Sequence, residues 1–284
     1  MNQSRVVVGV DGSPASMAAV THAAHVASSR GMSLHVLHAF APDLPMLGFG
    51  ALADRELVTE HGNRLLASAT ARAHAAHPDL TVTTSLHDGY ASPALIASSH
   101  TAALVVVGAV GQGLISRVSM GAVAMQVLTH AHCPVLVVGH EAVAAPVPQG
   151  RIVVGIDGSQ DSLAALHVAA REARIIGGTL EAVHAWRARA ATDPTLARSS
   201  SWEEYESAIE ERVRTTMAKT EAPDIACEVR VVRDDPVHAL TEASQGASML
   251  VVGARGDGGF DGLKVGSTAM RLVSRSACPV LVTR

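Results

Sequence analysis

The sequence predicts an α/β protein built from two tandem doubly wound domains, each with a five-stranded parallel sheet in the order 3-2-1-4-5 and helices on both faces. Three observations lead to this prediction: an internal repeat, a regular alternation of strand-like and helix-like segments in each copy, and strand candidates that are apolar almost throughout. Alternating strands and helices imply right-handed crossovers and parallel strands. Strands without a polar face are typical of a sheet covered on both sides.

The repeat consists of three blocks that recur in the same order at offsets of 145 or 146 residues. The paired blocks are 7–13 and 153–159, 104–109 and 250–254 with one valine dropped, and 133–137 and 278–282. Two copies of about 140 residues are duplicated domains rather than solenoid units. We therefore predict one domain over residues 1–143 and a second over 148–284, with a proline-containing linker of little charge within 141–150.

The individual elements are clearest in the second copy, and the first copy follows the same order. Short apolar runs predict strands at 151–156, 179–186, 227–232, 249–252 and 279–282. Segments of helical length predict helices at 163–176, from Ser201 onward, at 235–243 and at 266–276. An alanine-rich composition marks the first helix, and a glycine pair stops it. The second helix carries an apolar stripe with four-residue spacing, formed by Tyr205, Ile209, Val213 and Met217.

Composition excludes several classes of protein. Hydrophobic residues make up 48% of the chain and aromatic ones 2%, so the core must be built from aliphatic side chains. The net charge of −4 gives no basic surface for nucleic acid and no cationic face for an anionic membrane. We expect neither as a partner. Three cysteines without a CxxC pair are no disulfide framework; we expect buried thiols and a cytoplasmic protein.

A glycine motif follows the fourth predicted strand of the second copy. Gly253 and Gly256 are separated by two residues, and nine residues later Gly266 and Ser267 start a helix. Glycines after a strand let the backbone turn sharply and approach a ligand, and free N–H groups at a helix start attract phosphate. The alternative is a glycine-rich surface turn. Because an open α/β sheet places its ligand site at this edge, we favour a phosphate site.

The first predicted strand ends near a second candidate group. Asp157 has two interpretations, as the N-cap of the next helix or as an acceptor for a ribose hydroxyl or a phosphate-bound metal, and Ser159 could supply the cap instead. The first copy keeps the glycine pattern but differs at two positions. Ala122 stands where the second copy has Ser267, and Val110 where it has Arg255, so one hydroxyl and one cation are missing.

These motifs resemble the universal stress protein family in its tandem-domain form, over nearly the whole chain. ATP-binding members of that family carry G-x-x-G, nine residues, G-S/T, and residues 253–260 look especially like the actinobacterial versions. The resemblance implies that Asp11 and Asp157 approach the ribose and phosphates, and that the backbone near Ala39 and Ala185 contacts adenine. It also implies ATP as the ligand, with Mg²⁺ as its accompanying cation.

Two candidate nucleotide sites result. The second site comprises Gly155, Asp157, Ala185, Gly253, Arg255, Gly256, Gly258, Gly259, Gly266, Ser267 and Thr268. The first site, which we expect to be weaker, comprises Gly9, Asp11, Ala39, Gly108, Gly111, Gly113, Gly121 and Ala122. We assign no catalytic residue and no dedicated metal site. The chain holds 15 histidines, twelve in the first copy; metal binding is an alternative, but we favour solvated helix faces for pairs such as His22/His25 and His74/His77.

Two classes of function stay open. The first is a stress-response regulator in which nucleotide occupancy changes conformation or partner choice; the second is an enzyme with slow ATP hydrolysis or other adenylate chemistry. The motifs of dinucleotide dehydrogenases and Walker NTPases are absent. Residues 157–162 only faintly resemble the pyrophosphate loop of ATP pyrophosphatases. No convincing general base is evident, which favours the regulator.

The fifth predicted strands indicate an assembly. Residues 134–138 and 279–282 are short, apolar and uncharged, and in the order 3-2-1-4-5 they lie at a sheet edge. A bare apolar edge invites pairing, so we expect the two copies to pair through these strands and the chain to form a homodimer. The alternative is an edge blunted by Pro134 and Pro279. Apart from adenine nucleotide, the sequence does not identify a binding partner.

Overall fold

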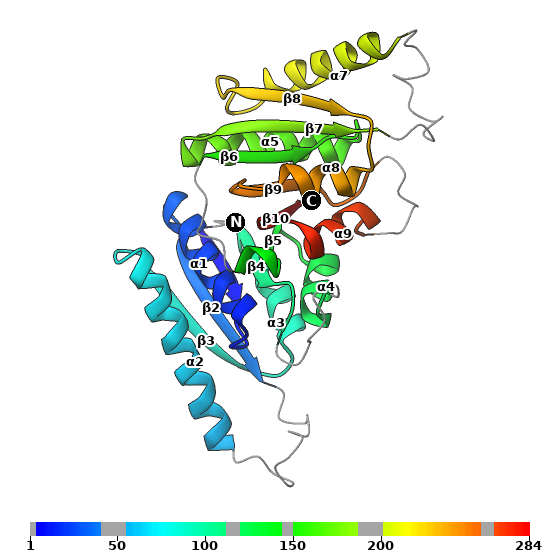
Figure 1. The fold of residues 1–284 in the computed structure, drawn as a ribbon. Coiled ribbons are helices and arrows are strands. Elements are labelled where there is room, and N and C mark those ends of the chain that lie inside the picture. The colour runs from blue at the N-terminus through cyan, green and yellow to red at the C-terminus, as the bar shows by residue number, and fades with distance from the viewer. Residues whose placement is uncertain (1–3, 41–54, 112–119, 144–149, 187–200, 257–263) are drawn as a thin grey trace. The chain divides into compact units, whose positions relative to one another are not determined.

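The chain folds into two compact α/β units, residues 1–144 and 145–284. The structure is a computed structural model that describes residues 4–40, 55–111, 120–143, 150–186, 201–256 and 264–284 (Figure 1). The predicted fold class is confirmed, because each unit holds five parallel strands alternating with helices. Within the described residues, no helix is both long and apolar enough to cross a membrane.

The first unit begins with its central strand. Its strands are β1 (Arg5–Gly9), β2 (Ser33–Phe40), β3 (Val82–Asp88), β4 (Leu104–Gly108) and β5 (Val135–Val138). Its helices are α1 (Pro14–Ser29), α2 (Arg55–Ala76), α3 (Ala91–Ser98), α4 (Ala122–His130) and the short 3-10 helix η1 (Glu141–Val143). The strands run in the order β3-β2-β1-β4-β5, as predicted. Helices α1 and α2 pack together over the sheet, as do α3 and α4.

The second unit repeats this topology. Its strands are β6 (Arg151–Gly155), β7 (Thr179–Ala185), β8 (Cys227–Val232), β9 (Met249–Gly253) and β10 (Val280–Thr283). Its helices are α5 (Gln160–Ile176), α7 (Trp202–Met217), α8 (Pro236–Ala243) and α9 (Ser267–Arg275). Counted within the unit, the strand order β8-β7-β6-β9-β10 is again 3-2-1-4-5.

A serine hydroxyl caps the first helix of each unit and determines where that helix begins. Ser159 has extended backbone angles, and its side chain accepts a hydrogen bond from the Ser162 N–H group. Helix α5 therefore starts at Gln160, three residues before the predicted start, and the N-cap interpretation of Asp157 is wrong. At the other end, Gly177 takes a left-handed conformation with φ of 65°, which a residue without Cβ adopts at little cost. Ser13 caps α1 in the same way as Ser159 caps α5.

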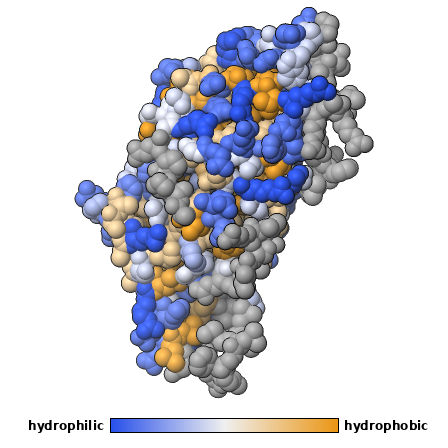
Figure 2. Space-filling model, in the orientation of Figure 1, coloured by the Kyte–Doolittle hydropathy of each residue, from blue (hydrophilic) through white to orange (hydrophobic). Residues whose placement is uncertain are grey.

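The predicted stripe of α7 forms a core with the few large aromatic rings of the chain. Tyr205, Ile209, Val213 and Met217 are all buried. Trp186, which follows β7, and Trp202 lie with their ring centroids 5.3 Å apart, and each is within 6 Å of the Tyr205 ring. Hydrophilic side chains cover most of the visible surface over α7, as expected for an amphipathic helix (Figure 2).

One of the histidines that we predict to lie on a solvated helix face, His22, is instead buried. His22 in α1 is only 6% exposed, and it hydrogen-bonds to the backbone of Ala142 in η1. Burial disfavours the charged imidazolium and lowers the pKa of His22 to about 4. His25 lies beside it, with its ring 5.6 Å from that of His77, and burial also lowers the pKa of His25.

Two of the three cysteines that we predict to be buried, Cys133 and Cys278, are buried, and the third, Cys227, is partly exposed.

We predict that His22 makes the protein acid-sensitive. The unfolded chain protonates this side chain near pH 6.5, whereas the native state resists protonation until about pH 4. Stability is therefore lost as the pH falls through this interval, by about 3 kcal/mol in total. Urea unfolding of the wild type and His22→Gln at pH 7 and pH 4.5 measures this loss. The variant should lose less stability than the wild type, and equal losses would contradict the assignment.

Candidate functional site

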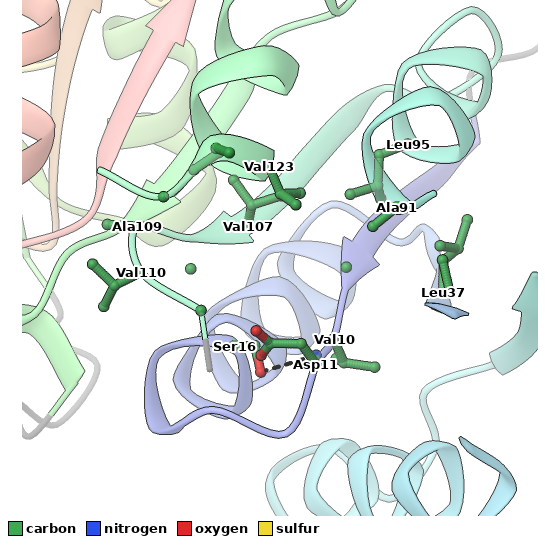
Figure 3. A pocket seen from close by; sticks show the side chains of 17 residues that line it. Val10, Asp11, Ser16, Leu37, Ala91, Leu95, Val107, Ala109, Val110 and Val123 are labelled. Carbon is green, nitrogen blue, oxygen red and sulfur yellow. Dashed lines mark hydrogen bonds between the residues drawn. The ribbon is translucent and has the colours of Figure 1, made fainter. Parts of the chain in front are cut away.

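The candidate site of the first unit lies at the carboxyl ends of β1 and β4. These strands are neighbours in the sheet, although β2 and β3 come between them in the chain, and the sequence order therefore reverses at this point. Open α/β sheets bind their ligands in the crevice outside such a switch point. A cavity of about 330 Å³ opens here, and Figure 3 shows the side chains that line it.

This cavity brings together the predicted first-site residues that the structure describes. Gly9, Asp11, Ala39, Gly108, Gly111, Gly121 and Ala122 all line it. Gly113 lies outside the described residues. The sequence analysis missed an apolar part of the wall, made by Leu37 of β2 and by Ala91 and Leu95 of α3. Leu37 stands two residues before Ala39 on the same strand face, which is a signal that could have found it.

An aspartate faces the glycine loop in both units. The Asp11 Oδ1 atom accepts a hydrogen bond from the Ser13 N–H group at 2.9 Å, and a Cβ placed on Gly111 would stand 2.6 Å from Asp11 Oδ2. In the second unit, Asp157 Oδ1 accepts from the backbone and hydroxyl of Ser159, and a Cβ on Gly256 would clash with Asp157 Oδ2. The second glycine of the motif therefore leaves room for the carboxylate beside it, which a Cβ would displace.

The first glycine of the motif is required by helix packing. A Cβ on Gly108 would lie 2.8 Å from the backbone of Ala15 in the first turn of α1. A Cβ on Gly253 would lie equally close to the backbone of Asp161 in the first turn of α5. Only glycine lets the end of the fourth strand come this near to the helix that follows the first strand.

The last glycine of the motif has no such reason among the residues that the structure describes. Gly121 and Gly266 are the N-caps of α4 and α9, with φ of −66° and −75°, which any residue adopts. Among the described residues, a Cβ would meet nothing closer than 3.5 Å at Gly121 or 3.6 Å at Gly266, which is ordinary contact. Neither residue supplies a side-chain cap to its helix. Within the described residues, both helix starts therefore leave room for a Cβ, although Gly121 is buried and Gly266 is half-buried.

The second site differs from the first by an ion pair. Arg255 donates hydrogen bonds from its backbone N–H group and from Nε to Asp161 Oδ2, at 3.1 and 3.2 Å. At the matching positions the first unit has Val110 and Ala15, so both partners are exchanged together. The sequence analysis predicted Arg255 as a site residue but missed Asp161. Comparing the two copies at Ala15 could have revealed it.

The other predicted second-site residues occupy matching places. Gly155 ends β6 and packs against Leu240, as Gly9 packs against Leu95, and Ala185 ends β7. Ser267 and Thr268 are the first two residues of α9, and both are exposed. Gly258 and Gly259 lie outside the described residues. Where the structure describes the chain, no cluster of three or more His, Cys, Asp or Glu side chains could hold a metal ion.

Comparison with known proteins decides the family. The family model described as "Universal stress protein family" matches twice, over residues 3–139 and 149–284. The chain belongs to the universal stress protein family. A universal stress protein of Mycobacterium tuberculosis is 33% identical over 292 aligned residues, which cover 98% of this chain and 96% of that protein. One from Mycobacterium bovis is also 33% identical and covers 99% and 97% of the two chains.

Solved structures support the tandem fold of this universal stress protein. The crystal structure of a universal stress protein from Archaeoglobus fulgidus matches 100% of this chain and 99% of its own, with a TM-score of 0.72 at 18% identity. A structure from Pseudomonas aeruginosa, titled a putative universal stress protein, matches 99% and 93% with a TM-score of 0.61 at 17% identity. At these identities the likeness concerns the fold alone.

We predict that the two end glycines of the second motif respond differently to alanine. Gly253→Ala forces a methyl group against the backbone of α5 and should lower the free energy of unfolding by about 1–3 kcal/mol. Gly266→Ala has room and a permitted conformation, so its cost should stay below about 1 kcal/mol. Urea titration of both variants measures this. A larger loss for Gly266→Ala would mean that the fold itself needs this glycine.

Proposed function

We propose that this universal stress protein is a regulator that binds adenine nucleotide, with ATP in its second domain, and whose occupancy changes its conformation or its choice of partner. The observation that carries the proposal is the bare start of α9. In the described part of the chain, Gly266 meets no conformational or packing requirement. A glycine kept at such a position is explained by a ligand that approaches the helix backbone closely.

The chemistry around α9 fits a polyphosphate. The N–H groups of its first turn, which receive no side-chain cap from Gly266, and its positive dipole end favour anions, and the Ser267 hydroxyl adds a donor. Arg255 contributes a positive charge at the neighbouring loop. ATP would bring Mg²⁺ with it. Asp157, at the end of β6 beside Gly256, supplies the type of carboxylate oxygen that this cation prefers.

Slow ATP hydrolysis is the second candidate function. Hydrolysis requires a group that positions the attacking water. Two carboxylates beside the loop, among the residues that the structure describes, already have structural tasks. Asp157 holds the turn at Ser159, and Asp161 holds Arg255. Because both carboxylates already make these hydrogen bonds, we favour a regulator over an enzyme. Single-turnover hydrolysis by the purified protein separates the two functions.

We predict that Gly266→Val abolishes ATP binding in the second domain without unfolding it. Two methyl groups and a Cβ would stand in the phosphate path, whereas the Cβ itself makes only ordinary contacts with the described residues. Isothermal titration calorimetry measures the binding, and Trp186 next to Ala185 provides a fluorescence signal from the same domain.

The matched change in the first domain, Gly121→Val, should leave the main ATP titration intact. The first site lacks the hydroxyl of Ser267, and a hydrogen bond to a charged phosphate contributes about 1.5–3 kcal/mol, roughly a 10- to 100-fold difference in affinity. Normal ATP binding by folded Gly266→Val would place the nucleotide elsewhere.

We also propose that the two domains pair through their fifth strands and that the chain forms a homodimer. Strands β5 and β10 are short and apolar, and each is the last strand on its side of its own domain's sheet order. Such an edge offers unpaired backbone groups to another strand. Separately expressed residues 1–143 and 148–284 should associate when mixed, as measured by analytical ultracentrifugation. Halves that stay monomeric after mixing would argue against this pairing.

A further inference from the structure

We infer that β8, the outer strand of the second domain, pairs antiparallel with β8 of a second copy of this chain. The inference deepens the homodimer proposed above, on which it rests, by naming the surface that joins the two copies. Three features of β8 carry it: a free backbone edge, two charged side chains whose spacing selects one register, and an apolar groove beside the strand.

The backbone of β8 has one free edge. Within its unit β8 is the last strand of the order β8-β7-β6-β9-β10, and among the described residues no strand pairs with its other side (Figure 1). The Leu180 N–H group donates to the Ala226 carbonyl at 2.9 Å, so the even-numbered residues of β8 direct their backbone groups toward β7. Because these groups alternate along a strand, the odd-numbered residues offer theirs to a partner. The outward-facing residues are Cys227, Val229 and Val231.

Two charged side chains select the register of such a pair. Glu228 and Arg230 lie two positions apart and therefore share one face of the strand. When two antiparallel strands are centred on Val229, Glu228 of each copy lies opposite Arg230 of the other. A centre at Glu228 or at Arg230 places like charges opposite each other, which is destabilising.

The remaining registers are poorer for a geometric reason. Outward-facing residues must pair with one another to exchange hydrogen bonds, so the centre lies on a residue and not between two. A centre at Val231 leaves residues 230–232 in register, and a centre at Cys227 leaves fewer. The register centred on Val229 therefore combines the longest overlap without like-charge contacts with two ion pairs related by a twofold axis.

Both charges are available for this contact. Glu228 is exposed and makes no ion pair with another described residue. Arg230 is held in place by Glu181, whose Oε1 atom lies 3.4 Å from Nε, and by the Ala239 carbonyl, 3.3 Å from Nη2. Neither contact uses Nη1, which can donate to a carboxylate of the second copy. The arginine thus loses little further side-chain freedom when the copies meet.

An apolar groove lies on the other face of β8. A cavity of about 480 Å³ opens between this strand and the second half of α7, and every residue that lines it is described. Cys227 and Val229 line it from the strand, and Val213 and Met217 from the helix. In the register centred on Val229, Val231 of the second copy lies opposite Cys227 on this face. Its side chain would contact the partly exposed thiol and the groove beside it.

The matching edge strand of the first domain, β3, lacks the charged pair. At the positions of Glu228 and Arg230 it has Thr83 and Ser85. Both hydroxyl groups hydrogen-bond to His35 of the same domain, at 2.9 Å. A pairing of β3 with itself would gain no ion pair, and we therefore assign the interface to β8.

Charge reversal in the full-length chain tests the register. Glu228→Lys places a lysine opposite an arginine twice across the interface, so the dimer dissociation constant should rise at least 10-fold in analytical ultracentrifugation. Thr83→Lys, at the matching position of β3, should leave that constant unchanged. An unchanged constant for Glu228→Lys, or an equal rise for Thr83→Lys, overturns the inference while the homodimer stands. A wild type that stays monomeric overturns both, so the two failures are distinguishable.

Disulfide crosslinking of the full-length chain is the second measurement. Val229→Cys places two thiols opposite each other on the twofold axis, with Cα atoms about 5.5 Å apart, within the span of a disulfide. In the Cys227→Ser background, oxidation with copper phenanthroline should give a covalent dimer on a non-reducing gel. The matched control, Thr84→Cys of β3 in the same background, should stay monomeric. Absence of the Val229→Cys dimer, or an equal yield from the control, overturns the inference.

Discussion

The close approach of one strand end to one helix start is the contact on which both candidate sites depend. In each domain the backbone after the fourth strand lies against the first turn of the helix after the first strand, at Gly108 and Ala15 and at Gly253 and Asp161. Without it, the aspartate after the first strand and the glycine loop after the fourth would not meet. The site is thus a consequence of parallel strand order together with one residue that lacks a Cβ.

Local chemistry explains how much could be predicted from sequence. Strands, caps and the order 3-2-1-4-5 follow from apolar runs, turn residues and the repeat, and these features act over a few residues. The apolar part of the cavity wall, formed by Leu37, Ala91 and Leu95, could not be predicted as one surface, because its residues come from a strand and a helix that are far apart in the chain. The burial of His22 has the same origin, since it depends on η1 folding back against α1.

Arg255 can still contact the phosphates of the proposed nucleotide although it is paired with Asp161. The bond to Asp161 uses the backbone N–H group and Nε, whereas a guanidinium has four further N–H donors. Asp161 therefore orients the arginine without using all of its donors. An arginine held in place loses less side-chain freedom when it meets a ligand. The exchange to Ala15 and Val110 in the first domain removes both the cation and the carboxylate that orients it.

The difference between the domains extends beyond the pockets to the helix that covers the second strand. In both, a histidine on that strand donates from Nδ1 to a backbone carbonyl just before the site aspartate: His38 to Val10 and His184 to Ile156, each at 2.8 Å. In the second domain the other nitrogen, Nε2, accepts from the Tyr205 hydroxyl at 2.6 Å. Tyr205 belongs to α7 and packs against Trp186 and Trp202.

A chain of buried hydrogen bonds thus joins the end of β6 to α7 in the second domain. Buried bonds of this kind are costly to break, so they tie the backbone at the end of β6 to α7. The residue after Ile156 is Asp157, whose Oδ2 atom lies beside Gly256 of the glycine loop. A ligand held between Asp157 and the start of α9 would consequently act on a backbone that is tied to an outer helix. The polar surface of that helix is where a change in occupancy could reach another protein.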